Sequence, residues 1–326
     1  MNCSVIQIVA GFTATLFFLV LSLHNLPTGT VGAHLANADP IWVGLAMLVY
    51  VGVLLLRARR WQIIMHPVAA IPNPTVASAL LVGYGLNAIL PARLGELFRA
   101  EFLKRSFGLD RVVALTSIVV ERLLDGLTVV ACLAVGLLLA AATRQNSGIL
   151  IDLLLTGSAV FGLILIVILC LAGPLRSRVF VHFPRVSTPM MILRGFALLR
   201  TRRTAEVAAF TLIICLPDAL VLWCVVKAMG LSLGFADTLV LLGVVSLSTL
   251  VPSGPAFLGT MQYGYALAIE FAGGPRAVGV AAATLAQLCL LLPVALAAMA
   301  VLVHGWGSAF FAVLAGRETK LTAAGP

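Results

Sequence analysis

Residues 87–99 read NAILPARLGELFR, and this stretch decides how the chain folds. A proline, a glycine and three charged side chains follow directly on an apolar segment, 75–90. If that segment enters a bilayer as a helix, Pro91 lies about 20 Å along its path, at about 1.5 Å per residue. Arg93 and Glu96 would then lie deep in the membrane, and Glu96 and Arg99, three residues apart, would share one helical face with Arg93 nearby. The alternative is a surface amphipathic helix at 94–106 with its charges at the interface.

The whole composition is that of a membrane protein. Of 326 residues, 61% are hydrophobic and 10% are charged, with a mean hydropathy of +1.12. A soluble domain carries about 25% charged residues, so a water-facing surface is excluded. The net charge of +9 sits in short loops between apolar segments, as the positive-inside rule produces, and does not indicate nucleic acid. We therefore expect an all-α integral membrane protein.

Six apolar segments approach or exceed the ~20 residues that cross a bilayer. They lie near 5–23, 40–56, 112–142, 150–172, 206–229 and 277–304. Regions 75–106 and 236–271 instead contain two short apolar segments each, broken by Pro and Gly. They predict two re-entrant broken-helix hairpins in a single transmembrane domain, 1–316, followed by a short cytoplasmic tail, 317–326.

Lysine and arginine predict the orientation. Seven arginines and no acid lie in 174–205, which places this loop in the cytoplasm. Arg57, Arg59 and Arg60, followed by Trp61, predict a second cytoplasmic loop after the span 40–56. The loops 24–39, 143–149 and 230–235 carry together one arginine, Arg144, and belong outside. Both termini are then cytoplasmic, and we expect a multi-pass protein of the bacterial inner membrane.

The two broken regions resemble each other. The segment 80–95 runs from LLVG to LPARLG, and 241–259 runs from LLG to VPSGPAFLG. The charge rule gives the surrounding units, 40–142 and 206–304, opposite orientations. Inverted repeats with broken helices mark many secondary transporters, whose substrates bind where the repeats meet. Broken backbone at membrane depth must be buried or line a wet cavity, and its helix N-termini could offer N–H donors to an anion. A chance likeness of two Pro- and Gly-containing segments is the alternative.

A second charged cluster, ERLLD at 121–125, begins about ten residues into the span 112–142. Glu121 and Asp125 share one helical face at i, i+4. A charge at the bilayer centre costs a few kcal/mol, so it is usually paired or faces a wet cavity. The economical arrangement pairs Arg93 or Arg99 with Glu121 or Asp125. A purely structural ion pair remains the alternative to a substrate site.

Catalytic and metal-binding motifs are absent from the sequence. No HExxH, CxxC, GxSxG or P-loop occurs, and the five histidines have no metal-ligand spacing. The six cysteines are typical of small packing residues in helices. Glu96 and Glu121 could in principle act as an acid/base pair, but the sequence is only a weak signal for this role. We expect no cofactor, no metal and no enzymatic activity.

Three motifs in order, PxRxGE at 91–96, ERxxD at 121–125 and PSGPxxxG at 252–259, resemble the transmembrane part of lysylphosphatidylglycerol synthase. This flippase-like family includes the membrane domain of the multiple peptide resistance factor. The resemblance covers most of 5–305, and no single motif is specific. In the synthase, a soluble aminoacyl-transfer domain follows the membrane part, in the position that would lie beyond Pro326 here. The resemblance therefore implies a stand-alone member that translocates lipid. The family often has an acid soon after the glycine of the third motif, where this chain has Thr260, Met261 and Gln262.

The favoured hypothesis is a lipid translocase, flippase- or scramblase-like, that moves a polar-headed or anionic lipid through a cavity between the repeats. Its expected arginines would hold phosphate while its acids orient them. The alternatives are a membrane-embedded enzyme or a non-transporting subunit of a complex for hopanoid, glycolipid or aminoacyl-lipid synthesis. A membrane lipid is the expected partner, and a homodimer and lipid-synthesis enzymes stay open. The expected substrate-binding residues are Asn87, Pro91, Arg93, Gly95, Glu96, Arg99, Glu121, Arg122, Asp125, Pro252, Ser253, Gly254, Gly259, Gln262 and Gln287.

Overall fold

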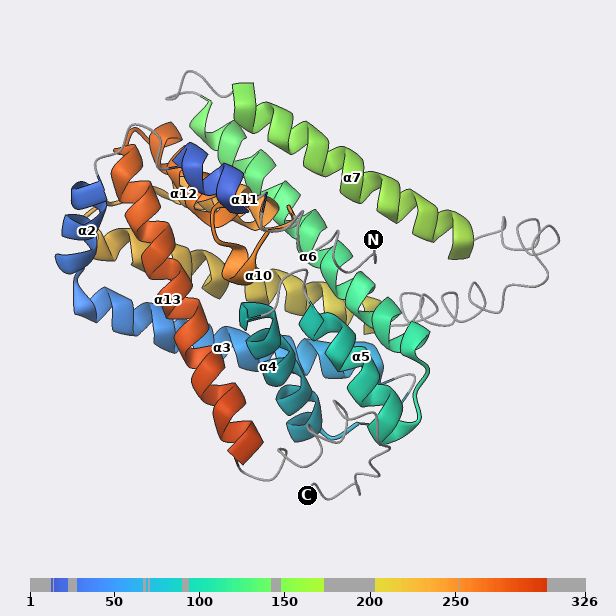
Figure 1. Cartoon of the computed structure of the whole chain (residues 1–326). Helices are drawn as coiled ribbons and strands as arrows, with labels where there is room; N and C mark the ends of the chain where they lie inside the picture. The colour runs from blue at the N-terminus through green and yellow to red at the C-terminus, as the bar shows by residue number, and fades with distance from the viewer. Residues whose placement is uncertain are drawn as a thin grey trace.

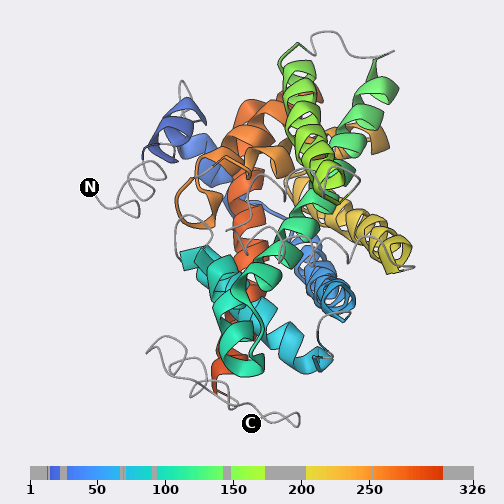
Figure 2. The ribbon, with the colours of Figure 1, turned by 90° about the vertical axis from the view of Figure 1, so that its right-hand side faces the viewer.

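The regular elements of the computed structural model are helices throughout the residues that it describes, which are 13, 15–22, 28–66, 69, 71–89, 94–141, 148–172, 203–251 and 253–303. Figures 1 and 2 show how they pack. The elements are α2 (Thr28–Ala36), α3 (Pro40–Met65), α4 (Asn73–Ile89), α5 (Leu94–Phe107), α6 (Arg111–Ala140), α7 (Gly148–Ala172), α10 (Arg203–Ala228), α11 (Phe235–Ser248), the 3₁₀ turn η3 (Pro255–Phe257), α12 (Thr260–Phe271) and α13 (Arg276–Val301).

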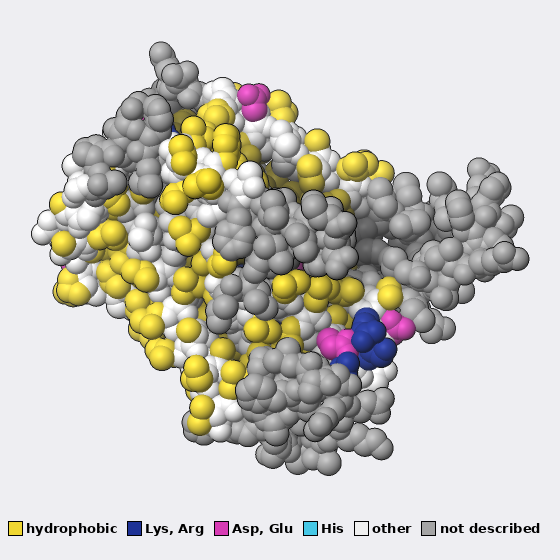
Figure 3. All heavy atoms as spheres, in the orientation of Figure 1, with side chains coloured by type: hydrophobic (Ala, Val, Ile, Leu, Met, Phe, Trp, Pro, Cys, Tyr) yellow, Lys and Arg dark blue, Asp and Glu magenta, His cyan; other side chains and the backbone are white. Residues whose placement is uncertain are grey.

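Five of the described helices are long and apolar enough to cross a membrane: α3, α6, α7, α10 and α13. Large apolar side chains on them face outward, where Figure 3 shows them spread over the surface. Leu48, Leu138 and Leu216 are each at least 70% exposed. Because apolar surface is favourably transferred out of water, outward-facing side chains of this kind on membrane-length helices fit contact with lipid. The protein is therefore a multi-pass membrane protein.

Four predicted spans are found where the apolar runs placed them, as α6, α7, α10 and α13. The prediction of a loop after residue 56 is wrong, because α3 continues as helix to Met65 and carries Arg57, Arg59 and Arg60. Arginine and glutamine are good helix formers, and buried partners described below hold this extension. The predicted outer loop 24–39 contains the helix α2. Of the predicted first span, 5–23, the structure describes residue 13 and the helical residues 15–22.

Side-chain caps start the two helices that carry the charges. Asp39 accepts a hydrogen bond from the Ile41 N–H (2.9 Å) at the start of α3, where Pro40 occupies the first turn. Asp110 accepts one from the Val112 N–H (2.8 Å) at the start of α6. These caps satisfy N–H groups that have no partner within the helix. They fix where α3 and α6 begin, and with that the register of the charged residues along them.

Each predicted broken region contains two short α-helices, and the second also contains η3 between them. The helices α4, α5, α11 and α12 have 17, 14, 14 and 12 residues, fewer than the ~20 that cross a bilayer. In the first pair, a Cβ on Gly95 would lie 1.9 Å from the Gly83 carbonyl oxygen, so only glycine allows α5 to approach α4. In the second, Gly259 adopts a φ of 86° just before α12, a conformation that favours glycine.

The two halves of the chain, α3–α6 and α10–α13, contact each other in a reciprocal pattern. α3 packs against α10. α6, from the first half, packs against α11, and α13, from the second half, packs against α4. Within each half the last helix also packs on the second short helix, α6 on α5 and α13 on α12. The largest apolar cluster of buried side chains joins both halves.

Candidate functional site

A buried charge network lies where α3, α5 and α6 meet, and Glu121 is its centre. Arg60 donates to Glu121 Oε1 (3.2 Å) and Arg99 donates to Glu121 Oε2 (3.1 Å). All three side chains are 0% exposed. Of the predicted pairings of Arg93 or Arg99 with Glu121 or Asp125, the structure contains that of Arg99 with Glu121. Because one carboxylate lies between two guanidinium groups, removing it would leave two buried cations without their partner.

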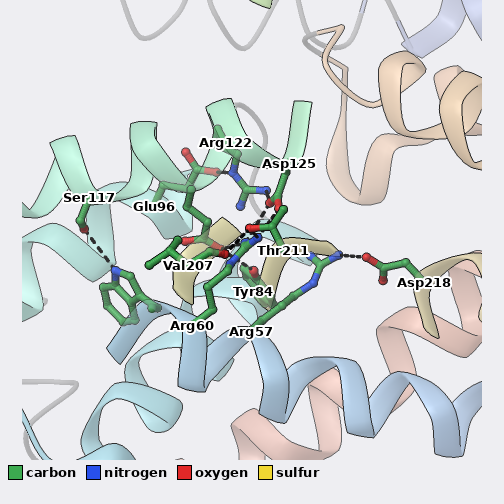
Figure 4. Close-up of polar contacts among 12 residues, drawn as sticks. Arg57, Arg60, Tyr84, Glu96, Ser117, Arg122, Asp125, Val207, Thr211 and Asp218 are labelled. Atoms are coloured by element: carbon green, nitrogen blue, oxygen red, sulfur yellow. Dashed lines mark hydrogen bonds and ion pairs between the residues drawn. The ribbon is translucent and has the colours of Figure 1, made fainter. Parts of the chain in front are cut away.

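Asp125 extends the network toward α10. Both of its carboxylate oxygens accept hydrogen bonds from Arg60, one of them at 3.0 Å. Arg60 also donates to the Thr211 hydroxyl (3.1 Å) on α10. Figure 4 shows Arg60 pointing from α3 into this group. A single arginine therefore connects α3, α6 and α10 in the buried interior.

Trp61 fixes the position of the second buried arginine. The Arg99 guanidinium lies 3.8 Å from the centre of the Trp61 ring, a favourable cation–π arrangement. The Trp61 indole N–H donates to the Ser117 hydroxyl (3.1 Å) on α6. Trp61 is fully buried, so it does not serve as an anchor at the membrane interface.

Helical spacing explains why these side chains meet. Arg57, Arg60 and Trp61 lie at i, i+3 and i+4 on α3, so they share one face. On α6, Glu121 and Asp125 are one turn apart and form the facing stripe. The spacing of the charged residues along α3 and α6 therefore places the arginines of one helix opposite the carboxylates of the other.

A cavity of about 300 Å³ borders this network on its more exposed side. Every helix of both halves contributes to its wall, and so does Phe161 of α7. The polar end is formed by Tyr50, Arg57, Tyr84, Asn87, Glu96, Arg122, Asp125, Thr211 and Asp218. The remaining wall is largely apolar, with Leu242, Leu250, Met261 and Leu290 among its side chains. The cavity therefore has one charged end and one hydrocarbon-like end.

Two ion pairs face into the cavity. Arg122 donates to Glu96 Oε1 (3.1 Å), and their side chains are 29% and 19% exposed. Arg57 donates to Asp218 Oδ2 (2.8 Å), and theirs are 21% and 23% exposed. Figure 4 shows the two pairs on opposite sides of Asp125 and Thr211. These groups are accessible to a ligand, whereas Arg60, Arg99 and Glu121 lie behind them.

The structure divides the expected site residues of the first half into two groups. Asn87, Glu96, Arg122 and Asp125 line the cavity. Gly95, Arg99 and Glu121 lie behind its wall, where Asn87 Oδ1 accepts the Gly95 N–H (2.7 Å) and so bridges α4 and α5. Pro91 and Arg93 lie outside the described residues.

The expected site residues of the second half mostly support the break between α11 and α12. Gln262 accepts the Gly259 N–H (2.8 Å) and donates to Gln287 (2.8 Å), and Gln287 donates to the Ala256 carbonyl (2.9 Å). Gln287 also lines the cavity. The Gly254 N–H is bonded to the Thr15 hydroxyl. Ser253 contacts the Thr260 hydroxyl (3.3 Å). Pro252 lies outside the described residues.

Sequence reasoning did not include Arg57, Arg60, Tyr84 and Asp218 in the site. Asp218 was detectable as a charge in the middle of the apolar span 206–229, where charges mark function by default. The i, i+3 spacing of Arg57 and Arg60 was a further signal. Among the described residues, no group of three or more His, Cys, Asp or Glu side chains could hold a metal ion.

Comparisons with known proteins identify the family of the chain. Residues 6–298 match the family described as the lysylphosphatidylglycerol synthase TM region. The chain is also similar to the glycosyltransferase AglD of Haloferax volcanii, at 30% identity over 139 residues. That similarity covers 42% of this chain and 22% of AglD, so the chain matches about a fifth of that relative. Because the family match extends over most of its length, the chain belongs to the lysylphosphatidylglycerol synthase transmembrane-region family.

Proposed function

We propose that the protein moves polar-headed lipids between the two leaflets of its membrane, in the manner of a flippase or scramblase. The observation that carries this proposal is the cavity between the two halves, with charged side chains at one end and apolar side chains over the rest of its wall. A lipid is divided in the same way, into a polar headgroup and apolar acyl chains. Its headgroup would lie against Arg122 and Arg57, and its chains against the apolar wall.

The apolar wall reaches the surface of the molecule near the break in the second half. Leu250 lines the cavity and is 42% exposed, and the neighbouring Val251 and Leu258 are 37% and 39% exposed. An opening edged by apolar side chains suits entry from the bilayer, because the acyl chains never leave an apolar environment. A headgroup without such a polar path would have to cross hydrocarbon, where charges are costly.

The architecture that we propose is an inverted repeat, 40–142 and 206–304, with α4–α5 and α11–α12 as re-entrant hairpins and 5–23 as a sixth span. The reciprocal packing of α6 on α11 and of α13 on α4 supports it. Short helices with a break between them are tolerated at membrane depth where they are buried in protein or line a cavity. Both breaks are close to the cavity, through Asn87 and Ala256.

Orientation gives a direct test of the repeat. We propose cytoplasmic termini in a bacterial inner membrane, because the arginine-rich segment 174–205 should be inside. In a cysteine-free background, Arg276→Cys should react with a membrane-impermeant maleimide in intact cells. Arg185→Cys should react only after permeabilisation. Reaction of both from the same side would contradict opposite orientations of the two units.

Lipid movement is the central test. Purified protein in vesicles of the host lipid extract, with acyl-labelled lipids added, should accelerate loss of label to a membrane-impermeant quencher. Arg122→Ala should slow it strongly, because that side chain faces the cavity, and Lys104→Ala, an exposed cation of α5 outside the cavity wall, should not. The proposal fails if vesicles with folded, monodisperse protein behave like empty ones across the whole extract.

The similarity to AglD favours a second candidate, a non-transporting membrane module of glycolipid synthesis. Such a module would hold a lipid in the cavity without releasing it to the other leaflet. Lipid that co-purifies with the wild type and is lost in Arg122→Ala, together with an absence of movement in vesicles, would favour this second function. Retained lipid and rapid movement together would favour translocation.

A further inference from the structure

The ion pairs that face the cavity leave hydrogen-bonding groups free on both partners. Arg122 donates to Glu96 through Nε, and its Nη1 lies 4.0 Å from Asp125 Oδ2, too far for a hydrogen bond. Arg57 donates to Asp218 Oδ2, and Asp218 Oδ1 has no hydrogen-bond partner among the described residues. The terminal nitrogens of Arg122 and one oxygen of Asp218 are therefore available to a ligand.

Neutral polar groups complete the same end of the cavity. The Tyr50 side chain lines it, and within the described part of the chain its hydroxyl has no hydrogen-bond partner. Asn87 uses its carbonyl oxygen to accept the Gly95 N–H (2.7 Å), which leaves its amide nitrogen as a donor. This end therefore offers both donors and acceptors that the protein itself does not use.

The carboxylates beside the arginines make this end unfavourable for an anion. Arg122 lies within 4.0 Å of both Glu96 and Asp125, and Arg57 lies 2.8 Å from Asp218. A phosphate at the free edge of Arg122 would be attracted by the guanidinium and repelled by carboxylates at a similar distance. The remaining attraction would do little to offset the cost of removing the phosphate from water.

A hydroxyl fits between the same two groups without a net charge. It accepts from a guanidinium and donates to a carboxylate, so it uses both partners of an ion pair without separating them. Two hydrogen bonds that meet at one hydroxyl oxygen span about 4–4.5 Å. The 4.0 Å gap between Arg122 Nη1 and Asp125 Oδ2 has this width.

We propose that the cavity binds an uncharged headgroup rich in hydroxyls, namely a sugar carried on a lipid. This inference rests on the proposed lipid movement and names its substrate class. One sugar hydroxyl bridges Arg122 and Asp125, and a second donates to Asp218 Oδ1. Tyr50 and Asn87 bind further hydroxyls, and the lipid chains lie along the apolar wall.

Four acyl-labelled lipids test the proposal in vesicles: a glucosyl diacylglycerol, its per-O-methylated form, phosphatidylglycerol and phosphatidylethanolamine. After the rate in empty vesicles is subtracted, we expect the glucosyl lipid to move about tenfold faster than each of the others, a ratio that corresponds to about 1.4 kcal/mol. The methylated lipid is uncharged but cannot donate, so it separates recognition of hydroxyls from a mere absence of charge. Equal rates, or faster movement of any of the other three lipids, would overturn the proposal.

Charge variants test why anions are disfavoured. Asp218→Asn and Glu96→Gln each remove a carboxylate beside an arginine, so each should raise the rate of phosphatidylglycerol relative to the glucosyl lipid about tenfold. Asp152→Asn, an exposed acid on α7 outside the cavity wall, is the matched control and should keep the wild-type ratio. If the first two variants fold and also keep that ratio, the paired carboxylates do not set the selection and the proposal is wrong.

A hydroxyl variant tests the neutral contacts. Tyr50→Phe should lower the ratio of the glucosyl lipid to phosphatidylglycerol about threefold, because it removes one partner of the sugar and no charge. Tyr263→Phe, on α12 outside the cavity wall, should leave the ratio as it is. An unchanged ratio in Tyr50→Phe would remove the tyrosine from the proposed site.

Binding separates this proposal from the proposed function. A short-chain glucosyl diacylglycerol, short-chain phosphatidylglycerol and methyl glucoside are titrated into the protein in a detergent without a sugar headgroup and followed by calorimetry. The glucosyl lipid should bind about tenfold more tightly than the other two; methyl glucoside binding as tightly would make the ligand a free sugar and overturn the lipid. Preferential binding of the glucosyl lipid without movement in vesicles would support the headgroup class and contradict translocation. Movement of lipids with preferential binding of phosphatidylglycerol would support translocation and contradict the headgroup class.

Discussion

Glu121→Gln is expected to lower the free energy of unfolding by about 3–5 kcal/mol, the usual cost of removing one partner from a buried ion pair. The substitution keeps the shape of the side chain and removes its charge. Arg60 and Arg99, both fully buried, would then face a neutral amide. Unfolding in mixed detergent micelles, followed by loss of helical circular dichroism, measures the change.

A double variant tells a charge effect from a packing effect. Arg99→Met combined with Glu121→Gln removes one of the two unbalanced cations, while Arg60 keeps both oxygens of Asp125. The double variant should therefore be more stable than Glu121→Gln alone. Glu270→Gln is the matched control, because Glu270 is 41% exposed and paired with Arg276 near the surface; an exposed pair contributes about 0–1 kcal/mol. Equal, mild effects of both Glu→Gln changes would show that the network does not hold the helices together.

The same network shows what the sequence could and could not predict. Glu121 and Asp125 stood out because charges inside an apolar run need a partner, and Arg99 was recognised as one such partner. Arg60 was assigned to a loop because three arginines after an apolar segment obey the positive-inside rule. That rule reads charge along the chain, whereas the partners of Arg60 on α6 are 61 and 65 residues away. Only tertiary packing brings them together.

The helical breaks were predictable for a different reason. Proline and glycine act locally, so LPARLG and VPSGPAFLG already mark where α4 and α11 end. Which groups then satisfy the broken backbone is a long-range matter. The Gly254 N–H is bonded to the Thr15 hydroxyl, 239 residues away, and Gln287 reaches the Ala256 carbonyl from another helix. The prediction that this second break would hold substrate rested on the broken backbone, the repeat and the family resemblance, and the structure gives most of its polar groups partners within the protein.

Beside the cavity, a free cysteine of the first half lies close to a free cysteine of the second half, and this pair offers a test of movement. Cys132 of α6 and Cys215 of α10 lie with their sulfur atoms 3.3 Å apart, and Cys215 lines the cavity. A disulfide has a sulfur–sulfur distance of about 2.0 Å, so a small approach would allow the bond. Oxidation by copper phenanthroline and oxygen should therefore link the first half to the second.

Translocation through alternating access requires one repeat to move against the other. In a variant that keeps only Cys132 and Cys215, oxidation should bring lipid movement down to the rate of empty vesicles, and a reductant should restore it. Mass spectrometry of the alkylated protein verifies that the bond has formed, and the same protein with Cys132→Ser should be insensitive to oxidant. Full activity of the cross-linked protein would mean that lipids cross without movement between α6 and α10, along a fixed polar path past Arg122 and Asp125. Loss of activity that reductant reverses would instead make the contact between α6 and α10 part of the moving interface.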